Sequence, residues 1–136
     1  MTEDLKNYNA LVVEDDASGL AIIAVMLRRL GMRTVMERFA DSAIERAKSM
    51  TKLDVVFLDL GLPDADGYEV LQALRSDPTL KDVPVIAVTA RDAGTELPKT
   101  QAAGFDGFLG KPLNRNRFPD QVRRIIRGEG VWEIYQ

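Results

Sequence analysis

Cysteine and histidine are both absent from the sequence, and their absence narrows the chemistry that the chain can perform. Without cysteine there is no disulfide, no thiolate zinc site and no cysteine nucleophile. Without histidine there is no Ser-His-Asp triad, no imidazole base and no histidine metal site. The reactive groups that remain are carboxylates, hydroxyls, lysines and any hard metal ion that oxygen atoms can hold.

Long apolar runs and a strong net charge are missing as well. Every apolar run is far shorter than the ~18 residues of a membrane helix, and the polar start at residues 1–9 is unlike a signal peptide. A formal charge of -3 gives little reason to expect nucleic-acid or membrane binding. We therefore expect a cytoplasmic protein that binds neither nucleic acid nor membrane.

Short apolar runs alternate with amphipathic stretches along the 136 residues, a length typical of one domain. The runs have the length and pattern of buried strands. They lie at residues 10–13, 34–39, 54–58, 83–88 and 107–109. Five strands alternating with five helices predict an α/β fold with a five-stranded parallel sheet and helices on both faces. We assign residues 9–126 to this domain, residues 1–8 to an N-terminal extension and residues 127–136 to a C-terminal tail.

Two helix starts can be predicted from single residues. Asp41 or Ser42 can cap the second helix. Pro98 would cost ~3 kcal/mol or more inside a helix. We therefore expect the fourth helix to begin near Leu97 or Pro98, after a longer loop at residues 91–96.

Polar side chains follow four of the predicted strands. The pair Glu14-Asp15 follows the first strand, Asp59 the third, Thr89 the fourth and Lys111 the fifth. Because the carboxyl ends of parallel strands meet at one edge of a sheet, we expect these side chains to converge. Converging carboxylates repel one another, and Mg²⁺ held by oxygen ligands would relieve that repulsion. The alternative for Glu14, Asp15 and Asp16 is an acidic cluster that only favours the start of the following helix.

Asp59 could serve as a metal ligand only, or it could be a nucleophile. Aspartate carboxylates can attack phosphorus and form aspartyl-phosphates. Lys111 and Thr89 could then neutralise charge on the phosphoryl oxygens. A cis bond between Lys111 and Pro112 would aim the lysine, although the sequence alone does not decide the isomer.

Between about Asn9 and Ile126 the chain resembles the receiver domain of two-component response regulators. The resemblance rests on the motifs Glu14-Asp15, Asp59-Leu-Gly-Leu-Pro63 continuing to Gly67, Val88-Thr89-Ala90 and Lys111-Pro112. Their spacing agrees with the family: 44 residues from Asp15 to Asp59, 30 from Asp59 to Thr89 and 52 from Asp59 to Lys111. The resemblance implies a flavodoxin-like sheet with the strand order 2-1-3-4-5.

The resemblance also implies roles for the site residues. Asp59 would accept a phosphoryl group from a histidine on a partner kinase or phosphotransfer protein. Asp15 and Asp59 would bind Mg²⁺ directly, Glu14 would act through water, and the main-chain carbonyl of Gly61 would complete the protein ligands. Thr89 would hydrogen-bond a phosphoryl oxygen, and would move inward on activation.

Three further positions gain an expectation from the family. Phe108 falls at the position of an aromatic switch whose rotation follows Thr89, and the alternative is an ordinary core aromatic. Gly61 and Arg91 fall where the family tunes the lifetime of the phosphoryl group. Glycine cannot shield that group, whereas Arg91 could cover it or engage it.

The expected function is that of a stand-alone receiver that signals by phosphorylation-dependent protein–protein contact, as a monomer or a weak phosphorylation-dependent dimer. It would be a bacterial protein that catalyses only its own phosphorylation and dephosphorylation. One alternative is an aspartyl-nucleophile phosphatase or phosphotransferase, although Gly61 stands where such enzymes need a second aspartate. A non-switching interaction module and a phosphate sink without a target are the others.

The tail carries bulky apolar residues, Trp132, Ile134 and Tyr135. They could pack back on the protein's own surface, or they could dock a partner beside a basic stretch. That stretch contains Arg123, Arg124 and Arg127.

Overall fold

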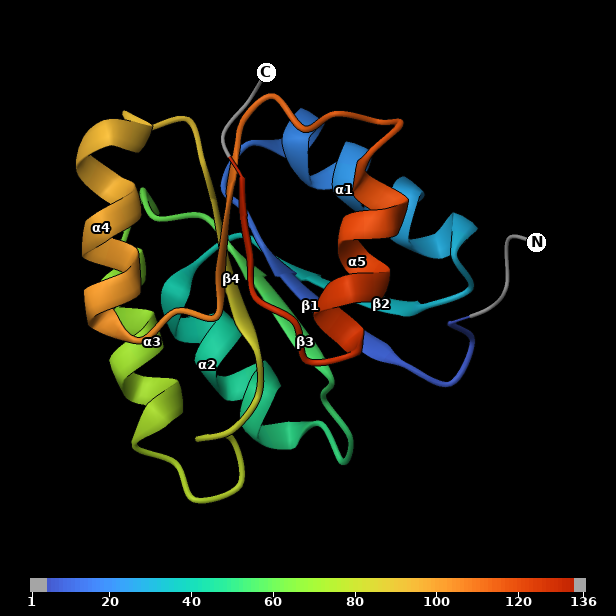
Figure 1. The fold of residues 1–136 in the computed structure, drawn as a ribbon. Coiled ribbons are helices and arrows are strands. Elements are labelled where there is room, and N and C mark those ends of the chain that lie inside the picture. Colours follow the sequence, from blue (N-terminus) through green and yellow to red (C-terminus); the bar gives the residue numbers. More distant parts are fainter. Residues whose placement is uncertain (1–4, 134–136) are drawn as a thin grey trace.

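The computed structural model describes residues 5–133 and arranges them as one parallel sheet with helices on both faces (Figure 1). The six strands lie in the order β2-β1-β3-β4-β5-β6. In chain order the elements are β1 (Asn9–Val13), α1 (Ala17–Arg29), β2 (Arg33–Glu37), α2 (Ala40–Ser49), β3 (Val55–Leu58), α3 (Gly67–Arg75), β4 (Val85–Thr89), α4 (Ala93–Ala103), β5 (Gly107–Gly110), α5 (Phe118–Ile126) and β6 (Val131–Glu133).

The predicted α/β class and the order of the first five strands are confirmed, but the count of five strands is wrong. β6 extends the sheet beyond β5, with Trp132 opposite Phe108 in parallel register. Its three residues are too few to show a strand period. Val131 is fully buried and Trp132 packs against the core, so this part of the tail packs on the protein's own surface. Ile134 and Tyr135 lie outside the described residues.

Alternate residues of the central strands face two separate cores, which is why these strands are almost uniformly apolar. In β1, Ala10 and Val12 pack in the core beneath α1 and α5. Leu11 and Val13 pack in the core beneath α2 and α3. Figure 1 shows α1 and α5 together on one face of the sheet and α2, α3 and α4 on the other. Between residues 5 and 133, no helix has the length and apolarity that a membrane crossing requires.

The start of α2 is capped from a distant loop. Asp64 accepts hydrogen bonds from the main-chain N–H groups of Ala40 (2.8 Å) and Asp41 (3.1 Å). These bonds hold the pKa of the Asp64 carboxyl below its usual value. The predicted cap by Asp41 or Ser42 is therefore wrong: Phe39 occupies the N-cap position, and the acceptor comes from outside the local sequence.

α4 begins at Ala93, so the expected start near Leu97 or Pro98 is wrong. The Asp92 carboxylate caps this start, because it accepts the main-chain N–H of Thr95 at 3.0 Å. Pro98 is the sixth residue of the helix and lies beyond its first turn, since the main-chain N–H of Glu96 already donates to the Asp92 carbonyl at 2.9 Å. There the proline removes only one main-chain hydrogen bond, and the cap compensates for it.

Hydrogen bonds to one carboxylate hold β6 against α5. Glu133 accepts from the Arg117 guanidinium, from Nε2 of Gln121 (2.8 Å) and from Nη1 of Arg124 (3.0 Å). Partial burial would raise the pKa of Glu133, but the bonds from Gln121 and Arg124 outweigh it and lower the pKa. The short strand is therefore fixed at its end by charge-assisted contacts.

Gly107 allows β6 to approach β5 closely. A Cβ atom at this position would lie 2.6 Å from the carbonyl oxygen of Val131 and 2.9 Å from Cδ1 of Ile86. The nearer contact is to main chain, which cannot rotate aside. The space for β6 is thus created by the missing side chain of Gly107.

We expect Gly107→Ala to lower the free energy of unfolding by about 1–3 kcal/mol, because the added methyl group must push β6 or Ile86 aside. Urea denaturation followed by circular dichroism measures this. Gly94→Ala is the control, since its Cβ would meet only the side-chain carboxylate of Asp92, at 3.2 Å, within a helix. The control should lose less stability than Gly107→Ala, since only one flexible side chain has to move aside. A Gly107→Ala protein of unchanged stability would contradict the close approach.

Candidate functional site

The polar residues predicted to converge do lie at one edge of the sheet. Thr89 ends β4, while Glu14, Asp59 and Lys111 directly follow β1, β3 and β5. The main-chain N–H of Lys111 donates to the Thr89 carbonyl at 2.9 Å, which aligns the ends of β4 and β5. Parallel pairing therefore brings together side chains that are far apart in the sequence.

Lys111 joins two of the carboxylates. Its Nζ hydrogen-bonds Oε1 of Glu14 and lies 3.6 Å from Oδ2 of Asp59. The peptide bond between Lys111 and Pro112 is cis. One ammonium group thus offsets the repulsion between two acidic side chains from different strands.

Glu14 is a carboxylate with almost no access to water, since its exposed fraction is 2%. Burial raises its pKa, and the nearby charge of Asp59 adds to that rise. The hydrogen bonds from Lys111 and from the main-chain N–H of Asp16 (3.1 Å) act in the opposite direction without cancelling it. Ionisation of Glu14 is therefore unfavourable in the folded protein.

The remaining donors suit a hard cation. Among residues 5–133, no three acidic side chains come close enough together to hold a metal ion by themselves. Mg²⁺ commonly takes only one or two carboxylates and completes its shell with other oxygens and water. Asp15 and Asp59 are both partly exposed, and Gly61, two residues after Asp59, is exposed. The residues predicted to supply oxygen ligands for Mg²⁺ are therefore accessible.

Thr89 presents a hydroxyl at the same edge. It is 1% exposed, and its Oγ1 accepts the main-chain N–H of Arg91 at 3.1 Å. A hydroxyl that accepts one hydrogen bond still has its own hydrogen to donate. Thr89 can therefore donate to an anionic oxygen placed near the ends of β3 and β4.

The two residues expected to tune phosphoryl lifetime are neighbours. Nη2 of Arg91 donates to the carbonyl of Leu60 (3.2 Å) and to Oδ2 of Asp66 (3.3 Å). A Cβ atom at Gly61 would lie 3.6 Å from the same nitrogen. Nη1 of Arg91 lies 3.6 Å from Oε1 of Glu96. Glu96 and Asp66 were not predicted as site residues, because nothing in the local pattern separates them from ordinary helix-start acids.

Phe108 lies fully buried on β5, in the core beneath α2 and α3. Its register partners are Ala87 on β4 and Trp132 on β6. This position satisfies the interpretation as a core aromatic. Its role as a switch stays a prediction.

Known proteins are similar to this chain in sequence and fold. The family model described as response regulator receiver domain matches residues 10–123. The chain belongs to this family. Similar proteins include the signal transduction histidine-protein kinase BarA of Escherichia coli (strain K12), 29% identical over 121 residues, which cover 89% of this chain and 13% of BarA. The polar-differentiation response regulator DivK of Brucella anthropi is 26% identical over 118 residues, covering 87% of this chain and 95% of DivK.

A solved structure extends the comparison to the site. The receiver domain of the sensor histidine kinase PA1611 from Pseudomonas aeruginosa PAO1 is 29% identical, with a TM-score of 0.80 over 88% of this receiver chain and 98% of that chain. That domain has a magnesium ion coordinated in its active-site cleft. This chain spans only a small part of the BarA proteins that it resembles, and nearly all of DivK.

The raised pKa of Glu14 predicts a specific pH dependence. The unfolded glutamate ionises near pH 4.5 and the folded one at higher pH, so the contribution of Glu14 to stability falls as pH rises through that window. We expect Glu14→Gln to gain stability relative to wild type over the same window, measured by urea denaturation in metal-free buffer at several pH values. The exposed Glu45→Gln is the control and should keep a constant difference. If the stability difference between Glu14→Gln and wild type did not change with pH, the pKa of Glu14 would not be raised in the folded protein.

Proposed function

We propose that this receiver accepts a phosphoryl group on Asp59 from a phosphohistidine of a partner kinase or phosphotransfer protein. The observation that carries the proposal is the ammonium group of Lys111, 3.6 Å from Oδ2 of Asp59 and bonded to Glu14. In the transfer, a carboxylate oxygen of Asp59 attacks phosphorus. The new O–P bond forms as the N–P bond to the histidine breaks. The histidine leaves as a neutral imidazole, either because its other ring nitrogen already carries a proton or because it takes one from water.

The neighbouring side chains stabilise the charge that this step develops. Lys111 can turn from Asp59 to the phosphoryl oxygens, since its Nζ already lies between two acidic groups. Thr89 can donate its hydroxyl hydrogen to another of these oxygens. Asp15, Asp59 and the carbonyl of Gly61 would hold Mg²⁺, with Glu14 acting through water. The ion supplies further charge neutralisation on the phosphoryl oxygens.

We further propose that the receiver signals by phosphorylation-dependent contact with another protein. DivK supports a receiver that works without a large attached domain, because the alignment covers 95% of it. In this proposal the chain catalyses only its own phosphorylation and the hydrolysis that reverses it.

We expect acetyl phosphate with Mg²⁺ to add the mass of one phosphoryl group to the wild-type chain and none to Asp59→Asn. Intact mass spectrometry measures this, and treatment with a magnesium chelator should abolish the gain. Asp82→Asn removes the same charge at an exposed position before β4 and should be modified like wild type. A wild-type chain that binds Mg²⁺ and gains no mass would refute the proposal.

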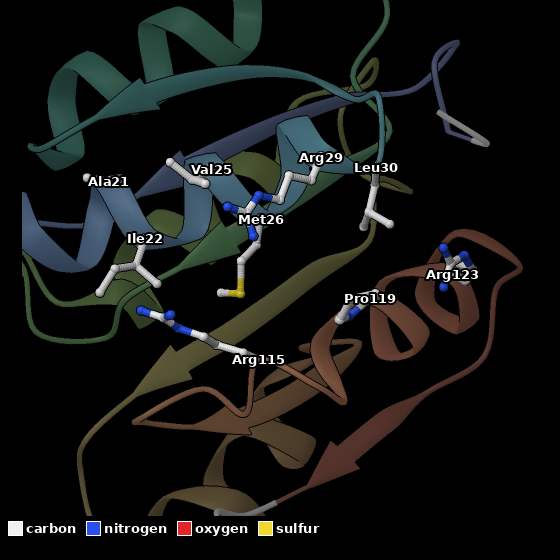
Figure 2. Close-up of a pocket in the computed structure, with 9 residues that line it drawn as sticks. All are labelled: Ala21, Ile22, Val25, Met26, Arg29, Leu30, Arg115, Pro119 and Arg123. Atoms are coloured by element: carbon white, nitrogen blue, oxygen red, sulfur yellow. The ribbon is translucent and has the colours of Figure 1, made fainter. Parts of the chain in front are cut away.

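A groove along α1 has an apolar surface on which the protein that donates the phosphoryl group could dock. Figure 2 shows Ile22 and Met26 on α1 pointing toward Arg115, in the segment that leads into α5, and Val25 farther round the same helix. Ile22 and Val25 are exposed by 42% and 47%, which is unusual for large apolar side chains that lie together. A second hollow shares Ile22 with this groove and continues to Lys111. The apolar surface is thus continuous with the acceptor site.

The chemistry of the groove indicates its occupant. Its apolar floor suits the apolar face of a helix, while Arg29 and Arg115 at the rim suit acidic residues beside that face. We propose that the helix bearing the partner's phosphohistidine docks here. Its histidine would then lie near Asp59.

We expect Ile22→Ala with Val25→Ala to slow phosphoryl transfer from a protein donor by roughly tenfold or more, because two central apolar contacts are lost. The donor is the histidine kinase that phosphorylates the wild-type chain fastest in a panel, and radiolabel transfer gives the rate. Modification by acetyl phosphate should be unchanged. Met36→Ala, at a 38% exposed residue outside the groove, is the control. Equal slowing with both donors would refute docking at this surface.

A further inference from the structure

Glu96 is a buried acidic residue in the first turns of α4, with an exposed fraction of 7%. The hydroxyl of Tyr68 donates to its Oε1 at 2.8 Å. Nη1 of Arg91 lies 3.6 Å from the same oxygen, and Nζ of Lys99 lies 3.8 Å from the other oxygen. A buried carboxylate needs such partners to stay ionised. Glu96 is therefore a fixed anion beside the loop that carries Arg91.

Contacts with Phe105 and Lys99 position the Tyr68 ring, and its hydroxyl hydrogen-bonds Glu96. Its ring meets Phe105 edge-on at 5.7 Å between centroids, and Lys99 lies 5.1 Å from the ring centre. Burial and the neighbouring Glu96 raise the pKa of the Tyr68 hydroxyl, so it stays protonated and keeps donating. The anion that faces Arg91 is thus anchored to α3 as well as to α4.

Arg91 divides its guanidinium between two anions and a carbonyl. Nη2 donates to Asp66 and to the carbonyl of Leu60, and Nη1 faces Glu96. Leu60 directly follows Asp59, so these contacts hold the guanidinium alongside the acceptor loop. A phosphoryl group on Asp59 would carry about two negative charges in place of the single charge of the carboxylate. Arg91 would then have a stronger anion within its reach.

We infer that Glu96 is a positioning residue that restrains Arg91 and thereby shortens the lifetime of the phosphoryl group on Asp59. This inference rests on the proposed function. In hydrolysis, water attacks phosphorus, the O–P bond to Asp59 breaks, and inorganic phosphate leaves. Arg91 covering the phosphoryl group hinders the approach of that water, and Glu96 competes for Arg91.

The test compares phosphoryl half-lives after labelling with acetyl phosphate and removal of the donor. Glu96→Gln keeps an acceptor for Tyr68 and removes the charge, and we expect a half-life roughly two- to fivefold longer, as for the loss of one competing ion pair. Arg91→Ala should shorten the half-life. In the Arg91→Ala background, Glu96→Gln should have no effect, because Glu96 acts only through Arg91.

Two further variants separate positioning from general damage. Glu69→Gln removes the same charge from an exposed site on α3 and should keep the wild-type half-life. Tyr68→Phe removes the hydrogen bond that anchors Glu96 but keeps the charge of Glu96, so its half-life should lie between those of wild type and Glu96→Gln. A half-life for Tyr68→Phe below that of wild type, or an equal Glu96→Gln effect in both backgrounds, would overturn the inference while leaving phosphorylation of Asp59 intact. Absence of phosphorylation in wild type would overturn the proposed function, and the inference with it.

Discussion

The ammonium group of Lys111 between Glu14 and Asp59 is the interaction on which the site depends. Two carboxylates at adjacent strand ends, one of them 2% exposed, would otherwise repel each other and resist ionisation. Lys111 reaches them only because β5 lies beside β4, and β4 beside β3, in parallel register. The sheet thus positions a cation from near the end of the chain against an acid from near its start.

The contacts on the two sides of the site differ in burial and length. On the side of β1 and β5, the buried Glu14 is paired with Lys111, whose side chain is 24% exposed, and both residues directly follow strands of the sheet. On the side of α3 and α4, Arg91 is 36% exposed and its contacts to Asp66 and Glu96 are longer than 3.2 Å. The pair with Asp66, in which the two side chains are 36% and 40% exposed, is worth little by itself. A new anion can therefore change the partners of Arg91 without disturbing the strands.

The strand ends could be predicted because apolar runs and the polar residues after them are local signals. Glu14, Asp59, Thr89 and Lys111 were placed together on that basis, and the sheet confirms the placement. Contacts between distant residues could not be predicted in the same way. The cap of α2 comes from a loop after β3, and β6 depends on space left by Gly107 on another strand. Neither leaves a periodic pattern in its own segment.

The start of α4 shows how one helix boundary changes the interpretation of the site. If the helix had begun at Pro98, Glu96 would lie in a loop and would not be held next to Arg91. The Asp92 cap instead begins the helix at Ala93, so Glu96 projects from an ordered turn toward Tyr68. Local propensity against proline is outweighed by a capping bond and by the packing of Ala93 and Leu97 against the core. The loop after β3 thereby gains a rigid anionic neighbour in Glu96, and Arg91 links that neighbour to Leu60 and Asp66.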